Sequence, residues 1–487
     1  MRESYTEQEP GAVTPEEIRE SSLWTPARVS AVSRNVFFVI AGCVIVGLFV
    51  TTSNLYYVAA AVGILILGVV LAWHFEAVMV VYAMVAFVPW GRTPDLAVGG
   101  SGMGKGLYVS QAMLGFLVVI WLIKYVFGSL AKDRIRTGFY VPLGLYLAYS
   151  VFNVLTSYLF WDYHVDIRNQ SLAVNVIDLA LRFLSAGALV LVATTISSRG
   201  WLKAVTWALL IAGLYNTVNG ALGFVPFEAP WWPLLAILPA AYFCGLALDR
   251  GYPIWQRAFG IAIVGVAIYT VFYGNISWVS GWMGLFAALF TVLMVRNRKA
   301  AFVAVLVTAI MLIAFWPFVQ KNVIENSRSE GDFDRLALLE GSWKYATTFP
   351  LGIGIGNYRA YNSFYYGEKW GTTQYGSAHG TYAQALAETG LPGLVLFLAV
   401  LACGFRWMLA SYKRVEGASR VYLAAALGQM VGIGTAAVVG DYIVPTYHNG
   451  GLVMFSTTIY TWLIWGLAVA HVRISGDQVS GSVDSNS

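Results

Sequence analysis

The sequence predicts an all-α integral membrane protein with about fourteen transmembrane helices and one long extracytoplasmic loop. Three observations support this prediction: the composition, the recurrence of long apolar runs and the distribution of basic residues. Of the 487 residues, 58% are hydrophobic and 11% are charged, whereas soluble domains carry about 25% charged residues. Most apolar runs span about 17–22 residues, the length that crosses a hydrocarbon core of roughly 30 Å.

The order of polar and apolar segments divides the chain into five parts. Residues 1–34 are polar and acidic and predict a disordered cytoplasmic tail. An N-terminal transmembrane bundle follows at 35–319, then an extracytoplasmic loop at 320–388 that holds the candidate catalytic residues, C-terminal transmembrane helices at 389–471 and a second disordered tail at 472–487. The predicted helices lie near 35–50, 55–72, 76–90, 110–127, 139–160, 177–197, 201–220, 231–248, 256–273, 277–295, 300–319, 389–408, 419–440 and 449–470.

Basic residues distinguish the two sides of the membrane, because they concentrate in cytoplasmic loops. The short odd-numbered loops contain only Arg92, Lys105 and Arg168. This asymmetry places both termini in the cytoplasm and segment 320–388 outside. The basic residues in or beside the even-numbered loops are Lys124, Lys132, Arg134, Arg136, Arg199, Lys203, Arg250, Arg257, Arg296, Arg298, Lys299, Arg406, Lys413, Arg414 and Arg420.

The cysteines and the net charge indicate which partners the protein is not expected to have. Cys43, Cys244 and Cys403 fall inside apolar runs and are expected to be buried free thiols. The formal charge of +5 belongs mostly to loops that topology explains, so no nucleic-acid partner is expected. No cofactor is predicted from these patterns.

The segment 320–388 is long enough to expect a function. Residues 332–347 form an amphipathic pattern, which predicts a helix on the membrane surface or against the bundle. A proline and three alternating glycines follow, and they predict a tight turn at Gly352, Gly354 and Gly356. The backbone amides of this turn either face an anion or serve the turn alone.

A polar block at Ser377–Gly393 runs into the next membrane helix. His379 begins this helical stretch, and Tyr382 and Leu386 follow on the same face. Glu388 is about half a turn out of phase with His379, so the two cannot pair along one regular helix. We expect Glu388 to cap a helix or to bind a neighbour.

The run from Arg335 to Glu388 resembles the bacterial O-antigen ligase and O-antigen polymerase superfamily. That family shows an arginine, an amphipathic helix, a Pro-x-Gly-x-Gly-x-Gly-Asn turn and, after a gap, a His block entering a membrane helix. The matching residues here are Arg335, Gly352, Gly354, Gly356, Asn357, His379, Tyr382, Ala387, Glu388, Gly390 and Gly393.

Two departures from the family pattern are visible. The asparagine that normally follows the histidine is Gly380, and the leucine after the tyrosine is Ala383. The family's Ser-Arg-Gly block has its closest match at Ser280–Gly284, which contains no arginine. The second phosphate-binding arginine of the family is therefore missing here or comes from elsewhere in the chain.

The resemblance implies transfer of a glycan from a polyprenyl diphosphate to the hydroxyl of a lipid-linked or glycan acceptor. It places the protein in the bacterial inner membrane, with its active site outside. Arg335 and Arg328 are candidates for binding the diphosphate, because guanidinium binds phosphate bidentately; the alternative for both is an ordinary surface charge. His379 is expected to act as general base or to anchor the donor phosphate. The remaining candidates for substrate binding are Tyr382, Gly354 and Gly356.

Arg182 is a separate candidate, because an intramembrane charge is costly. It lies within an apolar run and could supply the second phosphate ligand, or it could pair with Asp178 four residues earlier. Asp441 and His448 in the last outer loop either line the same cavity or belong to an ordinary polar loop.

The acceptor class and one rival function remain open at this stage. Polymerase, ligase and protein O-glycosyltransferase differ in the acceptor, which no residue identifies. The aromatic stretch 358–375 either stacks on sugar rings or packs the loop onto the bundle.

No metal is expected, because the first outer loop, Thr51–Leu55, lacks the acidic pair of metal-dependent polyprenyl-phosphate glycosyltransferases. A polysaccharide-precursor transporter or flippase is the alternative, although no internal repeat is visible.

Overall fold

The fold comes from a computed structural model of the chain. The chain divides into two compact units, one of residues 1–74 with 119–134 and the other of 75–118 with 135–487. The predicted helices at 35–50 and 55–72 lie outside the described residues. The structure describes residues 75–86, 109–126, 137, 139–165, 172–222, 233–273, 278–314, 316–320, 332–370, 376–447 and 451–484.

All regular structure in these ranges is helical, which confirms the all-α prediction. The second half of α5 is the described part of the first unit, and the other helices belong to the second. The helices are α4 (Phe75–Val85), α5 (Val109–Val126), α6 (Tyr140–Leu159), α7 (Leu172–Thr195), α8 (Arg199–Leu222), the 3-10 helix η2 (Pro233–Ala236), α9 (Ile237–Ala247), α10 (Ile254–Ile268), the π-helix η3 (Tyr269–Tyr273), α11 (Val279–Arg296), α12 (Arg298–Ala314), α13 (Trp316–Val319), α15 (Asp332–Thr348), α16 (Tyr358–Trp370), α17 (Thr381–Tyr412), α18 (Gly417–Ala436) and α19 (Gly451–Asp484).

Membrane-spanning helices are present within the described ranges. The outer face of α12 is apolar, and its large exposed side chains include Phe302, Leu306 and Ile313. Apolar side chains turned outward along a helix suit a lipid environment. The protein is therefore a multi-pass membrane protein. Five helices are long and apolar enough to cross a bilayer, at Leu172–Thr195, Ile254–Val271, Val279–Arg296, Thr381–Tyr412 and Met454–Ser475.

The core of the second unit forms around α19 and around the pair α11 and α18. Helix α19 contacts α7, α8, α17 and α18, and most of its side chains between Met454 and Ile474 are buried. Helices α11 and α18 approach closely at Gly428 and Gly432, which lie one helical turn apart. A Cβ atom at these positions would lie 2.8 Å from the Ala288 carbonyl oxygen and 2.4 Å from that of Gly284. Small residues at this spacing let helix backbones approach within a membrane.

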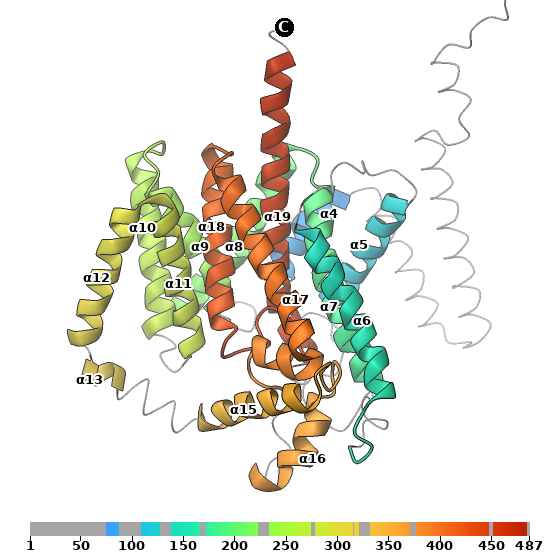
Figure 1. Cartoon of the computed structure of the whole chain (residues 1–487). Helices are drawn as coiled ribbons and strands as arrows, with labels where there is room; N and C mark the ends of the chain where they lie inside the picture. The colour runs from blue at the N-terminus through green and yellow to red at the C-terminus, as the bar shows by residue number, and fades with distance from the viewer. Residues whose placement is uncertain are drawn as a thin grey trace, which may run out of the picture. The chain divides into compact units, whose positions relative to one another are not determined.

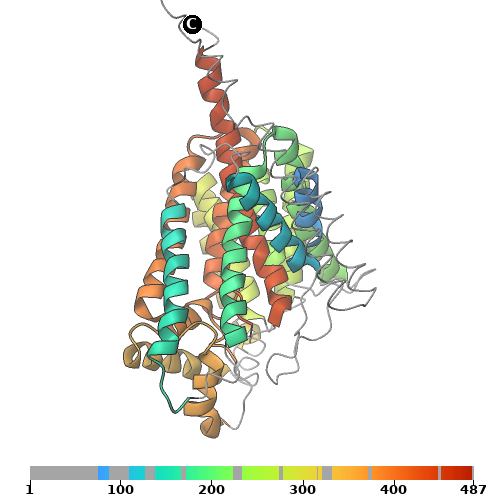
Figure 2. The same ribbon diagram turned by 90° about the vertical axis from the view of Figure 1, so that its right-hand side faces the viewer.

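Helices α15 and α16 lie at one end of this bundle, beside the start of α17 (Figures 1 and 2). The C-terminal part of α19 lies at the opposite end of the bundle (Figure 1). Helix α15 covers the amphipathic stretch predicted at 332–347. The bundle thus presents one end that carries residues 332–370 and 376–388 and another that carries short connections between helices.

Three boundaries differ from the sequence prediction. Helix α17 begins at Thr381 and kinks at Gly390, which has φ of 64°, so the membrane helix predicted from 389 is the part beyond the kink. Residues 358–370 form α16, where only an aromatic stretch was predicted. Helix α19 continues to Asp484, although a disordered tail was expected from 472; no proline interrupts this run.

Candidate functional site

The glycine turn between α15 and α16 docks on the first part of α17. The Ile353 amide donates to the Ala387 carbonyl oxygen at 3.0 Å, and the Gly354 amide donates to that of Glu388 at 2.9 Å. Gly352, Gly354 and Gly356 all have positive φ, a conformation that glycine adopts without steric cost. The turn is therefore bound to the helix that follows His379.

Gly352 and Gly390 allow this docking because the surrounding backbone leaves no room for a side chain at either position. A Cβ atom on Gly352 would lie 2.2 Å from the Glu388 carbonyl oxygen, and one on Gly390 would lie 2.1 Å from that of Pro350. Their φ angles are 86° and 64°. The kink in α17 and the turn thus fit each other through two glycines, one on each side.

Asn153 on α6 binds both sides of this contact. Its Nδ2 donates to the Leu351 carbonyl oxygen at 2.8 Å and to that of Glu388 at 3.1 Å. Its Oδ1 accepts the Ile355 amide at 3.0 Å. Asn153 is 1% exposed, so these bonds form away from water, where an unsatisfied polar group is costly. Asn153 was not among the residues singled out from the sequence.

Glu388 makes an ion pair with Arg182 across the bundle. Arg182 donates from Nη2 to Glu388 Oε2 at 3.0 Å and from Nη1 to the Tyr146 hydroxyl at 2.7 Å. The other carboxylate oxygen accepts the Gly356 amide at 2.9 Å and Gln384 Nε2 at 2.7 Å. The pair thus joins α6, α7, the glycine turn and α17. The sequence had predicted that Glu388 binds a neighbour or caps a helix.

The alternative partner predicted for Arg182 was Asp178, and the structure corrects this. Asp178 Oδ1 accepts the Tyr447 amide at 2.6 Å instead. Asp178 and Asp441 both interact electrostatically with Glu388. The arginine therefore lies among three buried carboxyl groups, and its hydrogen bond goes to the one on α17.

One face of α7 keeps unsatisfied polar atoms beside this ion pair. Asn175, Asp178, Arg182 and Ser185 follow one another at spacings that place them on the same face. Each is buried, and each has one side-chain atom without a hydrogen-bond partner among the described residues. Buried polar atoms are normally bonded to protein or water. This face of α7 therefore has capacity to bind further polar groups.

His379 lies directly before α17 in a strained conformation. Its φ is 48°, the left-handed region that residues with a side chain rarely adopt. Its amide donates to Ser377 Oγ at 3.2 Å. The next turn is held by the Thr381 amide, which donates to the Ala437 carbonyl oxygen at 2.9 Å. Left-handed residues held by their surroundings cluster at functional sites.

Gly380, a departure from the family pattern, has a steric explanation. A Cβ atom there would lie 2.6 Å from the Val438 carbonyl oxygen. The segment after α18 therefore occupies the space that an asparagine side chain would need. The same segment carries Tyr442, whose hydroxyl bonds to Ser280 Oγ at 2.8 Å. The Ser280–Gly284 block thus packs against the last connection of the bundle.

The aromatic stretch after the glycine turn serves two purposes. Tyr358 and Tyr361 are fully buried and meet Tyr345 edge to face at 5.9 and 6.0 Å. These rings pack α16 onto α15. Phe364 and Tyr365 are 52% and 46% exposed, and the Tyr365 hydroxyl donates to Asp162, which holds the pKa of that carboxyl below its usual value. The buried rings therefore confirm the packing interpretation, whereas stacking of the exposed rings on sugars stays a prediction.

The structure leaves some predicted site residues undescribed and assigns contacts to others. Arg335 lies on α15, but its side chain is outside the described part, as are all of Arg328 and His448. The Tyr382 hydroxyl donates to the Gly434 carbonyl oxygen at 2.8 Å. The Gly354 amide donates to the Glu388 carbonyl oxygen, and the Gly356 amide donates to the Glu388 carboxylate, so the acidic group that this turn faces belongs to the protein itself. A role of the two glycines in binding substrate stays a prediction.

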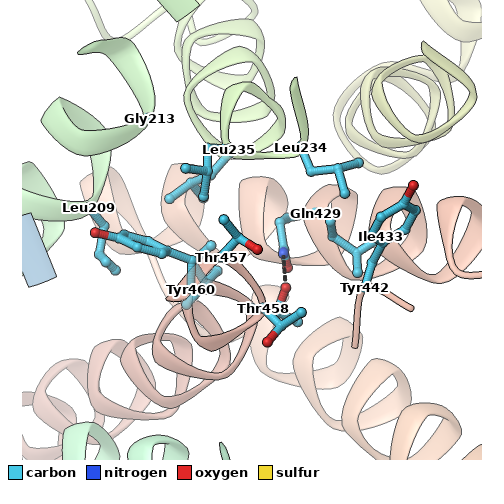
Figure 3. A pocket seen from close by; sticks show the side chains of 13 residues that line it. Leu209, Gly213, Leu234, Leu235, Gln429, Ile433, Tyr442, Thr457, Thr458 and Tyr460 are labelled. Carbon is cyan, nitrogen blue, oxygen red and sulfur yellow. Dashed lines mark hydrogen bonds between the residues drawn. The ribbon is translucent and has the colours of Figure 1, made fainter. Parts of the chain in front are cut away.

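A small cavity lies away from this site, among α8, η2, α18 and α19 (Figure 3). Its volume is about 20 Å³, room for one water molecule. Gln429, which lines it, donates to Thr461 Oγ1 at 3.1 Å. The cavity is too small for a substrate. Within the described ranges, no group of three or more His, Cys, Asp or Glu residues is arranged to hold a metal ion.

Comparison with known proteins agrees with this geometry. Residues 264–398, which include the glycine turn, His379 and Glu388, match a family model described as O-antigen ligase. No curated protein matches the chain. The family supports a glycosyltransferase-type role in polysaccharide assembly at the bacterial membrane, with lipid-linked glycan substrates. Residues 264–398 are therefore similar to the O-antigen ligase family that the motifs of this segment had predicted.

Proposed function

We propose that the protein transfers a glycan from a polyprenyl diphosphate donor to the hydroxyl of a lipid-linked or glycan acceptor. The observation that carries this proposal is the ion pair between Arg182 and Glu388. It fixes the glycine turn and α17 beside His379, and it lies on the face of α7 that has unsatisfied polar atoms. Donor diphosphate is already a good leaving group, so the site must bind the anion, orient the acceptor and accept a proton.

Each candidate residue has a proposed role in this reaction. His379 accepts the proton of the acceptor hydroxyl or anchors the donor phosphate, and Arg335 and Arg328 bind the diphosphate. Arg182 positions the turn through Glu388 and has one buried donor, Nε, without a partner in the described part. That donor supports a second role as phosphate ligand. Tyr382 and the glycine turn shape the wall of the site, and catalysis proceeds without a metal.

The proposed topology places this site outside the cytoplasm. The chain would cross the inner membrane about fourteen times, with residues 35–319 and 389–471 in the membrane and 320–388 outside. Both termini would lie in the cytoplasm, as the basic residues of the even-numbered loops indicate. Cysteine-accessibility labelling at Thr373, in the long loop, and at Asn297, between α11 and α12, would locate the two sides.

The test of the proposed chemistry is replacement of His379 and Arg335 in a host deleted for this gene. His379→Asn is the sharper variant, because asparagine tolerates positive φ and lacks a titratable ring. His379→Ala and Arg335→Ala accompany it. Lys344→Ala is the matched control, because Lys344 is an exposed cation on the same helix, α15, paired with Glu340.

The proposal expects carrier-linked donor to accumulate and finished polysaccharide to fall by about 100-fold or more in the site variants, at normal membrane abundance. Lys344→Ala should make normal product. The stalled glycan then identifies the acceptor: single repeat units indicate a polymerase, and full-length chains indicate a ligase. Normal product in every variant would contradict the proposal and favour a precursor transporter.

A further inference from the structure

The end of the bundle opposite the candidate site contains two neighbouring cavities. Helices α7, α17 and α19 all begin near the site and end near these cavities. The larger has a volume of about 880 Å³ and the smaller about 540 Å³, and both are lined by Tyr252 and Glu416. Ligand pockets typically measure about 300–1,000 Å³.

The charge of these cavities is positive. Arg199 and Lys203 line the larger one, and both are exposed and form no ion pair within the described residues. Glu416 is the acidic residue that both cavities share. The cavities are thus suited to an anion. Their charged lining residues are Arg199, Lys203, Arg250, Arg296 and Arg420, with Asp249 and Glu416 opposing them.

Asp249 is already neutralised within the smaller cavity. It forms an ion pair with Arg296 at 2.7 Å and accepts the Gly251 amide at 3.0 Å. Partial burial raises the pKa of Asp249, but these two partners outweigh that effect and lower it below its usual value. Asp249 therefore does not offset the charge of Arg199 and Lys203, which Glu416 alone opposes among the carboxylates that line the larger cavity.

The larger cavity also has an aromatic wall at the surface of the bundle. Trp207, Trp255 and Phe259 line it and are 46%, 66% and 52% exposed. Tryptophan at the end of a membrane helix lies at the level of the lipid head groups. A water-soluble anion would gain nothing from these rings, whereas a lipid would place its chains along them.

We propose that these cavities bind the phosphate head group of an anionic membrane lipid. The phosphate lies between Arg199 and Lys203, and the acyl or polyprenyl chain follows Trp207, Trp255 and Phe259. Basic pockets between membrane helices on the cytoplasmic side bind such head groups, and this end carries the basic loops. The site is separate from the proposed transferase site and does not depend on that reaction.

The experiment is native mass spectrometry of the purified full chain in detergent, titrated with phosphatidylglycerol or with neutral phosphatidylcholine. The variant is Arg199→Gln with Lys203→Gln, two exposed positions whose loss should leave the fold intact. The matched control is Arg298→Gln with Lys299→Gln. These residues begin α12, are exposed and line neither cavity.

We expect the unmodified chain to bind phosphatidylglycerol at least about tenfold tighter than phosphatidylcholine, and the cavity variant to lose about tenfold in affinity. The control should stay within about twofold of the unmodified chain. Equal binding of the two lipids by the unmodified chain would overturn the proposal. Equal losses in both double variants would also overturn it, because general surface charge would then explain the binding.

Two further probes separate the sources of the phosphate. Undecaprenyl phosphate that displaces phosphatidylglycerol would identify the carrier lipid as the ligand, and failure to displace it would identify a phospholipid; either result supports the lipid site. Inorganic phosphate that competes at equal concentration would overturn it, because the chains would then contribute nothing. No arm requires transferase activity, so the result is independent of the proposed function.

Discussion

Arg182 on α7 and Glu388 on α17 are 206 positions apart and form an ion pair of 3.0 Å, with side chains 3% and 1% exposed. Glu388 also accepts the Gly356 amide. A buried charge that loses its partner is strongly destabilising, whereas removal of both charges is often tolerated. The pair is therefore a structural requirement of the glycine turn as well as a candidate part of the site.

The first prediction concerns replacement of Arg182 while Glu388 is kept. Arg182→Met leaves the Glu388 carboxylate uncompensated and should cost about 3–5 kcal/mol of stability. Arg182→Met combined with Glu388→Gln should recover much of this loss, because the glutamine oxygen can still accept the Gly356 amide. Thermal unfolding in detergent measures both.

The control for this comparison is the exposed ion pair of Lys344 and Glu340, at 2.8 Å on α15. Lys344→Met should cost at most about 0.5 kcal/mol, because solvent screens an exposed pair. Equal unfolding temperatures for Arg182→Met and Lys344→Met would contradict the structural role of Arg182. Loss of product in the stable double variant would show that the Arg182–Glu388 pair has a role beyond stability.

The second prediction concerns the contact of the turn with the kink. Gly352→Ala places a Cβ atom 2.2 Å from the Glu388 carbonyl oxygen at a φ of 86°, so the turn must move away from α17. We expect the free energy of unfolding to fall by at least about 3 kcal/mol. Product should be lost as well. Gly144→Ala on α6 is the control, because nothing lies within 4 Å of its Cβ. It should be neutral or stabilise by up to about 1 kcal/mol; equal effects of the two would argue against the docked turn.

The sequence predicted the elements whose signal is local. The apolar runs at 139–160 and 277–295 became α6 and α11, and the amphipathic pattern at 332–347 became α15. Run length and helical periodicity are properties of contiguous residues, so they can be read without a fold. The motifs that matched the family were likewise contiguous, and the family match confirmed them.

The partners of the site residues could not be predicted in the same way. Arg182 has an acid four residues earlier, so local spacing offered Asp178 as its partner, and no local signal indicated Glu388. Asn153 lies in an apolar run, and its partners are more than 190 positions away. A polar residue inside a membrane helix is a functional candidate, so Asn153 carried a signal, but only the packing of α6 on α17 shows what it binds.

The third prediction tests Asn153. Asn153→Asp keeps the shape but replaces the Nδ2 donor with an oxygen that faces the carbonyls of Leu351 and Glu388. It should cost about 1–3 kcal/mol or more, because buried acceptors lose their donor, and product should fall. Tyr149→Phe is the control: its half-buried hydroxyl donates to the Thr389 carbonyl oxygen at 3.0 Å, and its loss should cost about 1 kcal/mol. A smaller effect of Asn153→Asp than of Tyr149→Phe would contradict this role.

The last prediction reverses the usual expectation for restoring a family residue. Gly380→Asn reinstates the asparagine of the family pattern, yet its Cβ atom would lie 2.6 Å from the Val438 carbonyl oxygen. Because that oxygen belongs to the backbone, the clash can be removed only if the segment after α18 shifts. This shift would disturb the hydrogen bond from the Thr381 amide to the Ala437 carbonyl oxygen. Gly380→Asn and Gly380→Ala should therefore both lower the unfolding temperature and the yield of product. Higher activity in Gly380→Asn would show that the segment yields and that the asparagine supplies a missing contact to the substrate.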